Sequence, residues 1–113
     1  MIHVKRIYSE PHKRDGLRLL VDRVWPRGMS KARANIDEWR KELAPSTALR
    51  KWFGHDPERW REFRARYRKE IKQKPEQLDR LRKLAREGAI TLVYSARDED
   101  HNNAVALKRM LLK

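Results

Sequence analysis

Short apolar runs separated by amphipathic stretches predict that strands and helices alternate along this chain. The N-terminal run, residues 2–8, alternates apolar and polar positions in the way typical of a partly exposed strand. Two later runs, residues 17–24 and 90–94, are nearly continuous and rich in branched side chains, as in strands covered on both faces. Turn residues from Pro11 to Gly16 separate the first run from the second.

Helical spacing of apolar residues predicts two short helices after the second run. Pro26 and Gly28 end the strand, and the helix that follows is expected to carry three apolar residues at helical spacing, Ile36, Trp39 and Leu43. Ser46 suits the N-cap of the next helix and Gly54 suits its C-terminal end.

Three more helices are expected before the chain ends. Asp56 and Pro57 suit the start of a long helix, which has a buried stripe formed by Trp60, Phe63, Tyr67 and Ile71. Another helix is predicted from Pro75 to Gly88, and a last one begins at Asn102 or Asn103.

This order of elements predicts an α/β fold over residues 1–113. Two buried strands with helices between them suggest a parallel pair joined by a long crossover, with helices covering the sheet. A chain of 113 residues is long enough for one hydrophobic core and too short for two, so we expect a single domain with a short, mainly parallel sheet.

Composition excludes several classes of chemistry. The chain has no cysteine, so disulfides, thiolate catalysis and sulfur-bound zinc are excluded. Its four histidines show no metal-ligand spacing, and no P-loop, dinucleotide fingerprint or nucleophile elbow occurs, so we expect neither a metal nor a cofactor. No apolar run is long enough for a membrane span or a signal peptide, which makes a cytoplasmic protein without membrane contact the expectation.

The net charge of +13 suggests an anionic partner. The excess lies mainly in residues 1–35 and 55–88, and such charge attracts phosphorylated ligands, nucleic acids or acidic proteins. A solvated surface that serves only solubility and stability is the alternative interpretation. An exposed Trp52 or Trp60 would favour a homodimer over a monomer.

Two loops leave the carboxyl ends of the buried strands, where open parallel sheets bind their ligands. The first loop carries a carboxylate, two guanidinium groups and an indole, from Asp22, Arg23, Arg27 and Trp25. This set can bind an anion and stack a planar ring, with Asp22 as a catalytic candidate. The same residues also have a structural interpretation, in which Asp22 fastens the turn and Trp25 anchors the core.

The second loop supplies a phenol, a hydroxyl and an amide near a helix N-terminus. Tyr94 is a further catalytic candidate, while Ser95 and Asn102 are candidate ligand contacts. Asn102 suits a helix cap equally well. If the two strands are neighbours, both loops open into one cleft, and its occupant would be an anionic small molecule.

A basic stripe on the long helix supports a competing hypothesis. Four cations recur at helical spacing, namely Arg61, Arg64, Arg68 and Lys72, and a helix of this kind could lie on a phosphate backbone. Glutamates interspersed among them also allow ordinary surface ion pairs. The alternative function is therefore a non-catalytic module that binds nucleic acid.

The segment from Leu20 to Gly28 resembles the signature of the YeaO-like branch of the family called domain of unknown function 488. Residues 37–39, 44–53, and 92–96 with 102–104 match the same pattern in order. The resemblance implies an α/β domain in a bacterial or archaeal cytoplasmic protein, and it implies no reaction. By motif position it supports the site residues above and adds two from the middle segment, Ser46 and Arg50.

One position departs from this family pattern. Asn103 stands where histidine is frequent in the pattern, and an amide does not titrate. The departure disfavours any scheme that needs a proton-transferring group at that position.

Overall fold

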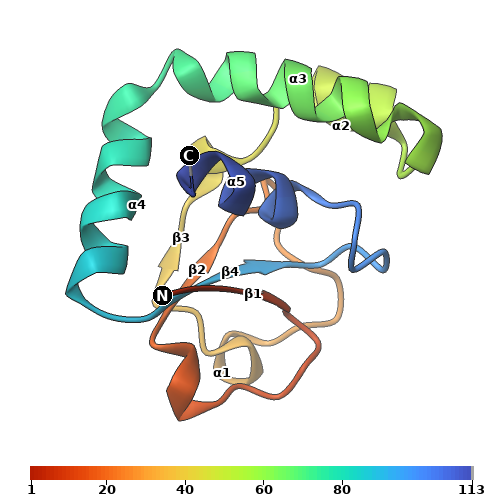
Figure 1. The fold of residues 1–113 in the computed structure, drawn as a ribbon. Coiled ribbons are helices and arrows are strands. Elements are labelled where there is room, and N and C mark those ends of the chain that lie inside the picture. The colour runs from red at the N-terminus through yellow and green to blue at the C-terminus, as the bar shows by residue number, and fades with distance from the viewer. Residues whose placement is uncertain (113) are drawn as a thin grey trace.

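Four parallel strands form the sheet at the centre of the molecule (Figure 1). In the computed structural model, which describes residues 1–112, these are β1 (Ile2–Arg6), β2 (Leu17–Leu20), β3 (Glu38–Trp39) and β4 (Ile90–Tyr94). Their order across the sheet is β1-β4-β2-β3. The predicted α/β class with a short parallel sheet is therefore confirmed.

The two strands predicted to be central are neighbours. β4 is buried at all five positions and pairs with β2 through Leu19 opposite Leu92 and Leu20 opposite Val93. β1 lies on the other side of β4 and is only half-buried, as its alternating sequence predicts. Because all the strands are parallel, their carboxyl ends share one edge of the sheet.

Helices cover both faces of the sheet, unequally. One face carries α2 (Thr47–Phe53), α3 (Trp60–Lys72), α4 (Pro75–Glu87) and α5 (Asn103–Leu111), which pack on a core that includes Leu19 and Leu92. The opposite face has a smaller core around Leu20 and Val93, and the single-turn helix α1 (Lys31–Ala34) covers it (Figure 1).

The boundaries of most helices follow the predicted caps. Ser46 accepts a hydrogen bond from the N–H of Leu49 at the start of α2, and Gly54 ends that helix in the left-handed conformation. Asn102 caps α5 in the same way through the N–H of Val105. Asp56 caps a short 3-10 turn, Pro57–Arg59, that leads directly into α3.

The helix predicted around Ile36, Trp39 and Leu43 is wrong. Asn35 ends α1 in the left-handed conformation, and the chain then pairs with β2 as the short strand β3. Ile36 and Trp39 pack on the smaller core, whereas Leu43 lies in the larger one. The three residues have the spacing of one helical face, but Leu43 lies on the opposite face of the sheet from Ile36 and Trp39.

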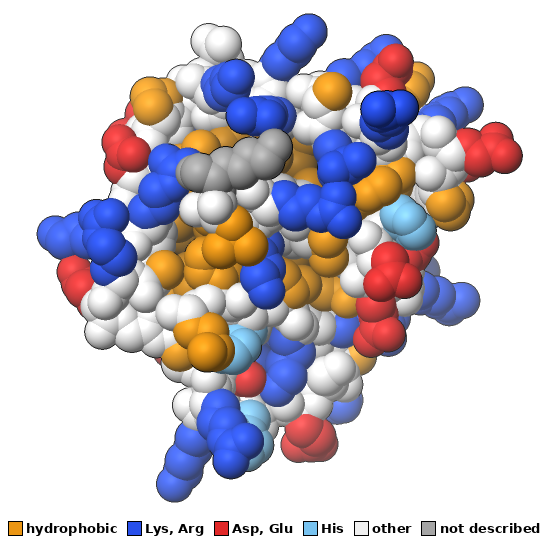
Figure 2. All heavy atoms as spheres, viewed as in Figure 1, with side chains coloured by type: hydrophobic (Ala, Val, Ile, Leu, Met, Phe, Trp, Pro, Cys, Tyr) orange, Lys and Arg blue, Asp and Glu red, His pale blue; other side chains and the backbone are white. Residues whose placement is uncertain are grey.

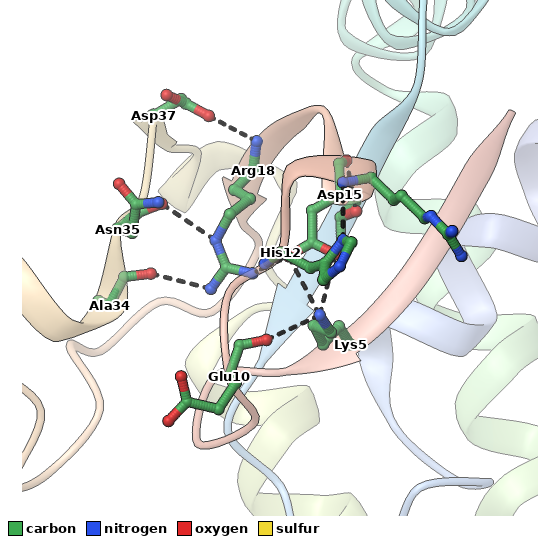
Figure 3. Close-up of polar contacts among 10 residues, drawn as sticks. Lys5, Glu10, His12, Asp15, Arg18, Ala34, Asn35 and Asp37 are labelled. Carbon is green, nitrogen blue, oxygen red and sulfur yellow. Dashed lines mark hydrogen bonds and ion pairs between the residues drawn. The ribbon is translucent and has the colours of Figure 1, made fainter.

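A buried arginine fastens the start of β2 to the segment before β3 (Figure 3). Arg18 is 2% exposed, and its guanidinium donates to the Asp15 carboxylate at 2.6 Å and to the carbonyls of Ala34 and Asn35 at 2.8 and 3.0 Å. Lys5 donates to the same carboxylate at 2.9 Å. The network thereby joins β1, β2 and the end of α1.

Along residues 1–112, no helix has the length and apolar character needed to cross a membrane. The same stretch holds no cluster of three or more histidine, aspartate or glutamate side chains suited to a metal ion.

Candidate functional site

A cleft of about 1040 Å³ opens at the carboxyl edge of the sheet. Its walls come from the segments that follow β1, β2 and β4, together with the turn before α2 and parts of α2 and α3. The two loops singled out in the sequence therefore meet in one cleft, because β2 and β4 are neighbours. Seven of the nine candidate site residues line it: Asp22, Arg23, Trp25, Arg27, Arg50, Ser95 and Asn102.

Asp22 joins the two loops across the cleft. One carboxylate oxygen accepts from the backbone N–H of Ser95 at 3.0 Å and from its hydroxyl at 2.7 Å. The other oxygen accepts from the side-chain amide of Asn103 at 3.2 Å, and that amide also donates to the carbonyl of Val21 at 2.7 Å. Asp22 thus holds the end of β2 against the start of the second loop and α5.

Burial raises the pKa of the Asp22 carboxyl above its ordinary value. The hydrogen bonds from Ser95 and Asn103 and the positive charge of Arg50 act in the opposite direction without cancelling the effect of burial. The folded protein consequently binds a proton at Asp22 more tightly than the unfolded chain does.

This pKa shift predicts a pH-dependent contribution to stability that Asp22→Asn removes. A raised pKa in the folded state means that stability is greatest while Asp22 is protonated and falls as pH rises through the folded-state pKa. Relative to Asp22→Asn, the wild type should therefore lose unfolding free energy as pH rises from the ordinary aspartate range toward neutrality. Urea denaturation of both proteins across that range measures the difference.

Asp79→Asn is the matched control, because Asp79 is an exposed carboxylate on α4. Its difference from the wild type should stay nearly constant over the same pH range. A constant difference for Asp22→Asn as well would contradict the raised pKa.

Five arginines and two aspartates supply the charge of the cleft lining. The arginines are Arg6, Arg23, Arg27, Arg50 and Arg97, and the aspartates are Asp22 and Asp98. Within residues 1–112, none of these five guanidinium groups forms a salt bridge. The cleft therefore has an excess of positive charge that no carboxylate of the described chain neutralises by direct contact.

Two of these arginines are held in place by backbone carbonyls. The Nε–H of Arg6 donates to the carbonyl of Ala96 at 2.9 Å, and the Nε–H of Arg23 donates to that of Pro45 at 3.2 Å. No hydrogen bond within residues 1–112 engages the terminal nitrogens of either guanidinium. The two terminal nitrogens of a guanidinium can bind an anion end-on with two parallel hydrogen bonds.

Asp98 and His101 form a pair at the rim of the cleft. The Nδ1 of His101 lies 2.9 Å from a carboxylate oxygen of Asp98, and the imidazole packs edge-on against the Trp60 indole. The hydrogen bond with His101 is the main reason that the pKa of Asp98 lies below its ordinary value. Asp98 also accepts from two backbone N–H groups of its own loop, so this pair shapes the turn before α5.

Tyr94 and Ser46 lie outside the cleft lining. Tyr94 is 3% exposed and belongs to the larger core, where burial raises the pKa of its phenol. Ser46 caps α2, and its hydroxyl and backbone N–H both donate to the carboxylate of Glu70 on α3. The catalytic role of Tyr94 and the ligand contact of Ser46 remain predictions.

Trp25 and Asn102 combine a place in the cleft wall with structural contacts. The Trp25 indole donates to the carbonyl of Met29 and packs edge-on against Trp39 at 5.3 Å. Asn102 is 2% exposed and serves as the cap of α5. Both side chains are therefore fixed from the protein side, which leaves little of either free to contact a ligand.

Sequence reasoning missed Arg6, the last residue of β1. The rule that directed attention to the ends of β2 and β4 applies equally to β1, because β1 is parallel to both. The signal was present in the sequence, since Arg6 follows an alternating run directly. The floor residues Phe53 and Phe63 carried no signal of this kind, because their helical spacing indicates only the core.

The basic stripe of α3 lies apart from the cleft lining. Arg61, Arg68 and Lys72 are exposed, whereas Arg64 is half-buried with its guanidinium 5.5 Å from the Trp60 ring centre. The aromatic residues of α3 are buried, so they cannot stack on nucleic-acid bases. Trp52 is half-buried between the guanidinium groups of Arg59 and Arg66, so the exposed tryptophan that would favour a homodimer is not found.

Comparison with known proteins places the chain in a family. A family model described as "Inactive DUF488-N3 subclade" matches residues 1–113. The chain belongs to this DUF488 subclade. It is 42% identical to "Uncharacterized protein YeaO" of Escherichia coli over 106 residues, which cover 94% of this chain and 92% of the relative. The resemblance seen in the sequence is thereby confirmed.

Mycobacterial proteins of the same family are also similar to this chain. "Uncharacterized protein Rv3073c" of Mycobacterium tuberculosis is 38% identical over 110 residues, or 97% of this chain and 92% of the relative. "Uncharacterized protein Mb3100c" of Mycobacterium bovis matches to the same extent. No solved structure matches the chain.

Proposed function

We propose that this DUF488 protein binds an anionic small molecule in the cleft at the carboxyl edge of its sheet. The observation that carries the proposal is that the guanidinium groups of Arg6 and Arg23 are held in place while their terminal nitrogens have no partner within residues 1–112. Each guanidinium is held by its Nε on a backbone carbonyl, and within residues 1–112 neither has a carboxylate partner. Side chains fixed in this way lose little freedom on binding, so their terminal nitrogens form a prepared anion site.

The remaining lining defines the kind of anion. Arg27, Arg50 and Arg97 are exposed cations around the same cleft, and Asp22 carries a carboxyl whose pKa is raised by burial. Apolar groups, including Pro26, Val24, Pro45 and Phe53, cover much of the rest. A phosphate or carboxylate group joined to an apolar or planar body suits this combination of walls.

Binding without catalysis is the role that the contacts of Asp22 favour. Both of its carboxylate oxygens already accept hydrogen bonds from Ser95 and Asn103, and these contacts fix the carboxyl group between the two loops. The word "inactive" in the description of the matched subclade agrees with this choice. We therefore assign Asp22 to positioning the two loops and the arginines to holding the ligand.

Titration calorimetry with inorganic phosphate and pyrophosphate at low salt tests the proposal. The wild type should bind pyrophosphate, and the double variant Arg6→Gln with Arg23→Gln should bind it at least about tenfold more weakly, because two charge-assisted contacts are removed. A second double variant, with lysine at both positions, keeps the charge but loses the fork geometry and should be intermediate.

The matched control removes the same charge elsewhere. Arg61 and Arg68 are exposed on α3, and glutamine at both positions should change pyrophosphate affinity by less than about twofold. If both glutamine double variants bound pyrophosphate equally weakly, the loss of affinity would come from the lower net charge and not from a specific site. That result, or the absence of binding by the wild type, would overturn the proposed site.

Nucleic-acid binding through α3 is the competing function. The exposure of Arg61, Arg68 and Lys72 favours it, since a phosphate backbone needs accessible cations. A fluorescently labelled oligonucleotide should then bind the wild type with strong salt dependence and should lose affinity in the α3 variant. Unchanged oligonucleotide affinity in that variant would remove this alternative.

A further inference from the structure

The outer edge of β1 offers unpaired backbone groups. Its register with β4, together with the bonds from Ile90 N–H to Met1 C=O and from Ile7 N–H to Tyr94 C=O, shows that odd-numbered residues of the strand face β4. Ile2, Val4 and Arg6 therefore direct their backbone groups away from the sheet. Within residues 1–112 no other strand lies beside this edge, and β1 occupies the front of the sheet in Figure 1.

The charged side chains of β1 do not guard this edge. Natural sheets discourage strand addition with mobile charges, lysine above all, on their edge strands. Here Lys5 is tied to the Asp15 carboxylate and to the carbonyl of Glu10, each at 2.9 Å (Figure 3). Arg6 is tied to the carbonyl of Ala96. Both cations are thus fixed to their own chain, and the edge remains available to another strand.

A hollow of about 300 Å³ adjoins this edge. It is lined by His3, Val4 and Lys5 of β1 and by His12, Arg14 and Asp15 of the turn that follows. Asp15 already accepts hydrogen bonds from Lys5, Arg18 and the His12 N–H, and within residues 1–112 the Arg14 guanidinium and the His3 imidazole are the parts of the lining without a hydrogen-bond partner. In Figure 2, histidine, lysine and arginine side chains gather in the lower part of this face with some acidic side chains among them, and hydrophobic side chains interspersed with basic ones lie above.

We propose that the outer edge of β1 binds an extended segment of a partner protein that alternates acidic and apolar side chains. The added strand would bond to the free backbone groups of Ile2 and Val4 and to the Arg6 N–H. Because side chains alternate across a strand, its acidic residues would enter the hollow beside His3 and Arg14. Its apolar residues would lie on the opposite face, next to Ile2 and Val4, which pack against the larger core.

Charge decides between this occupant and a second copy of the chain. Each copy carries a net charge of +13, so pairing two β1 edges would bring the two basic hollows together. An acidic segment is attracted to the same surface. The anion site proposed above lies at the carboxyl edge of the sheet, and its failure would leave the β1 edge untouched.

Fluorescence anisotropy with a short capped peptide that alternates valine and glutamate tests the inference. The wild type should bind this peptide, and a peptide alternating valine and lysine should not bind. Val4→Pro removes an outward N–H without breaking the ladder to β4, and it should weaken binding at least about tenfold, whereas Val4→Ala keeps the N–H and should weaken it less. Thermal unfolding shows whether Val4→Pro is folded.

A change in the peptide alone keeps the test independent of protein folding. Methylating the backbone nitrogens of alternate peptide residues, in either of the two registers, blocks one edge of its strand. One register should weaken binding at least about tenfold and the other should have little effect. Equal affinity of the unmethylated and both methylated peptides, or no binding of the valine-glutamate peptide, would overturn the inference.

Discussion

Replacing Arg18 by methionine is expected to lower the free energy of unfolding by about 3–5 kcal/mol, because it removes the buried guanidinium from its ion pair with Asp15, whose carboxylate keeps the contact with the partly exposed Lys5. The guanidinium of Arg18 lies 2.6 Å from Asp15, which is itself only 6% exposed. The substitution also removes the donors that satisfy the carbonyls of Ala34 and Asn35. Chemical denaturation at neutral pH measures the loss.

Two comparisons identify the buried ion pair as the cause. Arg80→Met removes an exposed pair with Glu38 and should cost less than about 1 kcal/mol.

Burial acts to raise the pKa of Asp15, but Lys5, the His12 N–H and Arg18 outweigh it, so the pKa lies below its ordinary value. Stability from a lowered pKa is present above the unfolded-state value and is lost as pH falls through the folded-state value. The cost of Arg18→Met should therefore shrink in acid, and equal costs for Arg18→Met and Arg80→Met would contradict this account.

Phe63→Ala should have a loss of similar size, about 3–5 kcal/mol, because it opens a cavity where the aromatic residues meet. Phe63 is 2% exposed, with ring centres 4.3 Å from Phe53, 5.8 Å from Trp60 and 5.6 Å from Tyr67. It also belongs to the floor of the cleft. The same variant should therefore bind pyrophosphate more weakly than the wild type.

Two further variants separate the cavity from general effects of the substitution. Phe63→Leu keeps most of the buried volume and should cost well under half as much. Leu112→Ala, at a position 66% exposed, should change stability by less than about 0.5 kcal/mol. A Phe63→Ala protein as stable as Leu112→Ala would contradict the predicted cost of the cavity.

Local sequence patterns were sufficient to predict most of the fold. The apolar runs of β2 and β4, the caps Ser46 and Asn102, and the buried stripe of α3 each follow from side chains close together in sequence. The helix predicted over residues 36–43 was wrong because contacts with residues distant in the sequence determine the conformation of this segment. Trp39 pairs with Leu20 in β3, while Leu43 accepts the hydroxyl of Tyr67 through its carbonyl.

The location of the site could be predicted from the sequence, whereas only some of the residues that line it could. The ends of neighbouring parallel strands meet by geometry, so the loop of Asp22 and the loop of Ser95 could be brought together from the sequence. Side-chain direction could not be predicted, since it depends on packing. Tyr94 lies in the core and Ser46 bonds to Glu70, although both occupy family motifs. Arg6 needed the position of β1 beside β4.

A crystal structure of the wild type grown with phosphate or sulfate is the most direct test of the anion site. We expect an anion between the Asp22–Arg27 loop and the Ser95–Asn102 loop, bound by the terminal nitrogens of Arg6 or Arg23. An empty cleft, with anions bound only along the exposed cations of α3 from Arg61 to Lys72, would contradict the account and favour the nucleic-acid alternative.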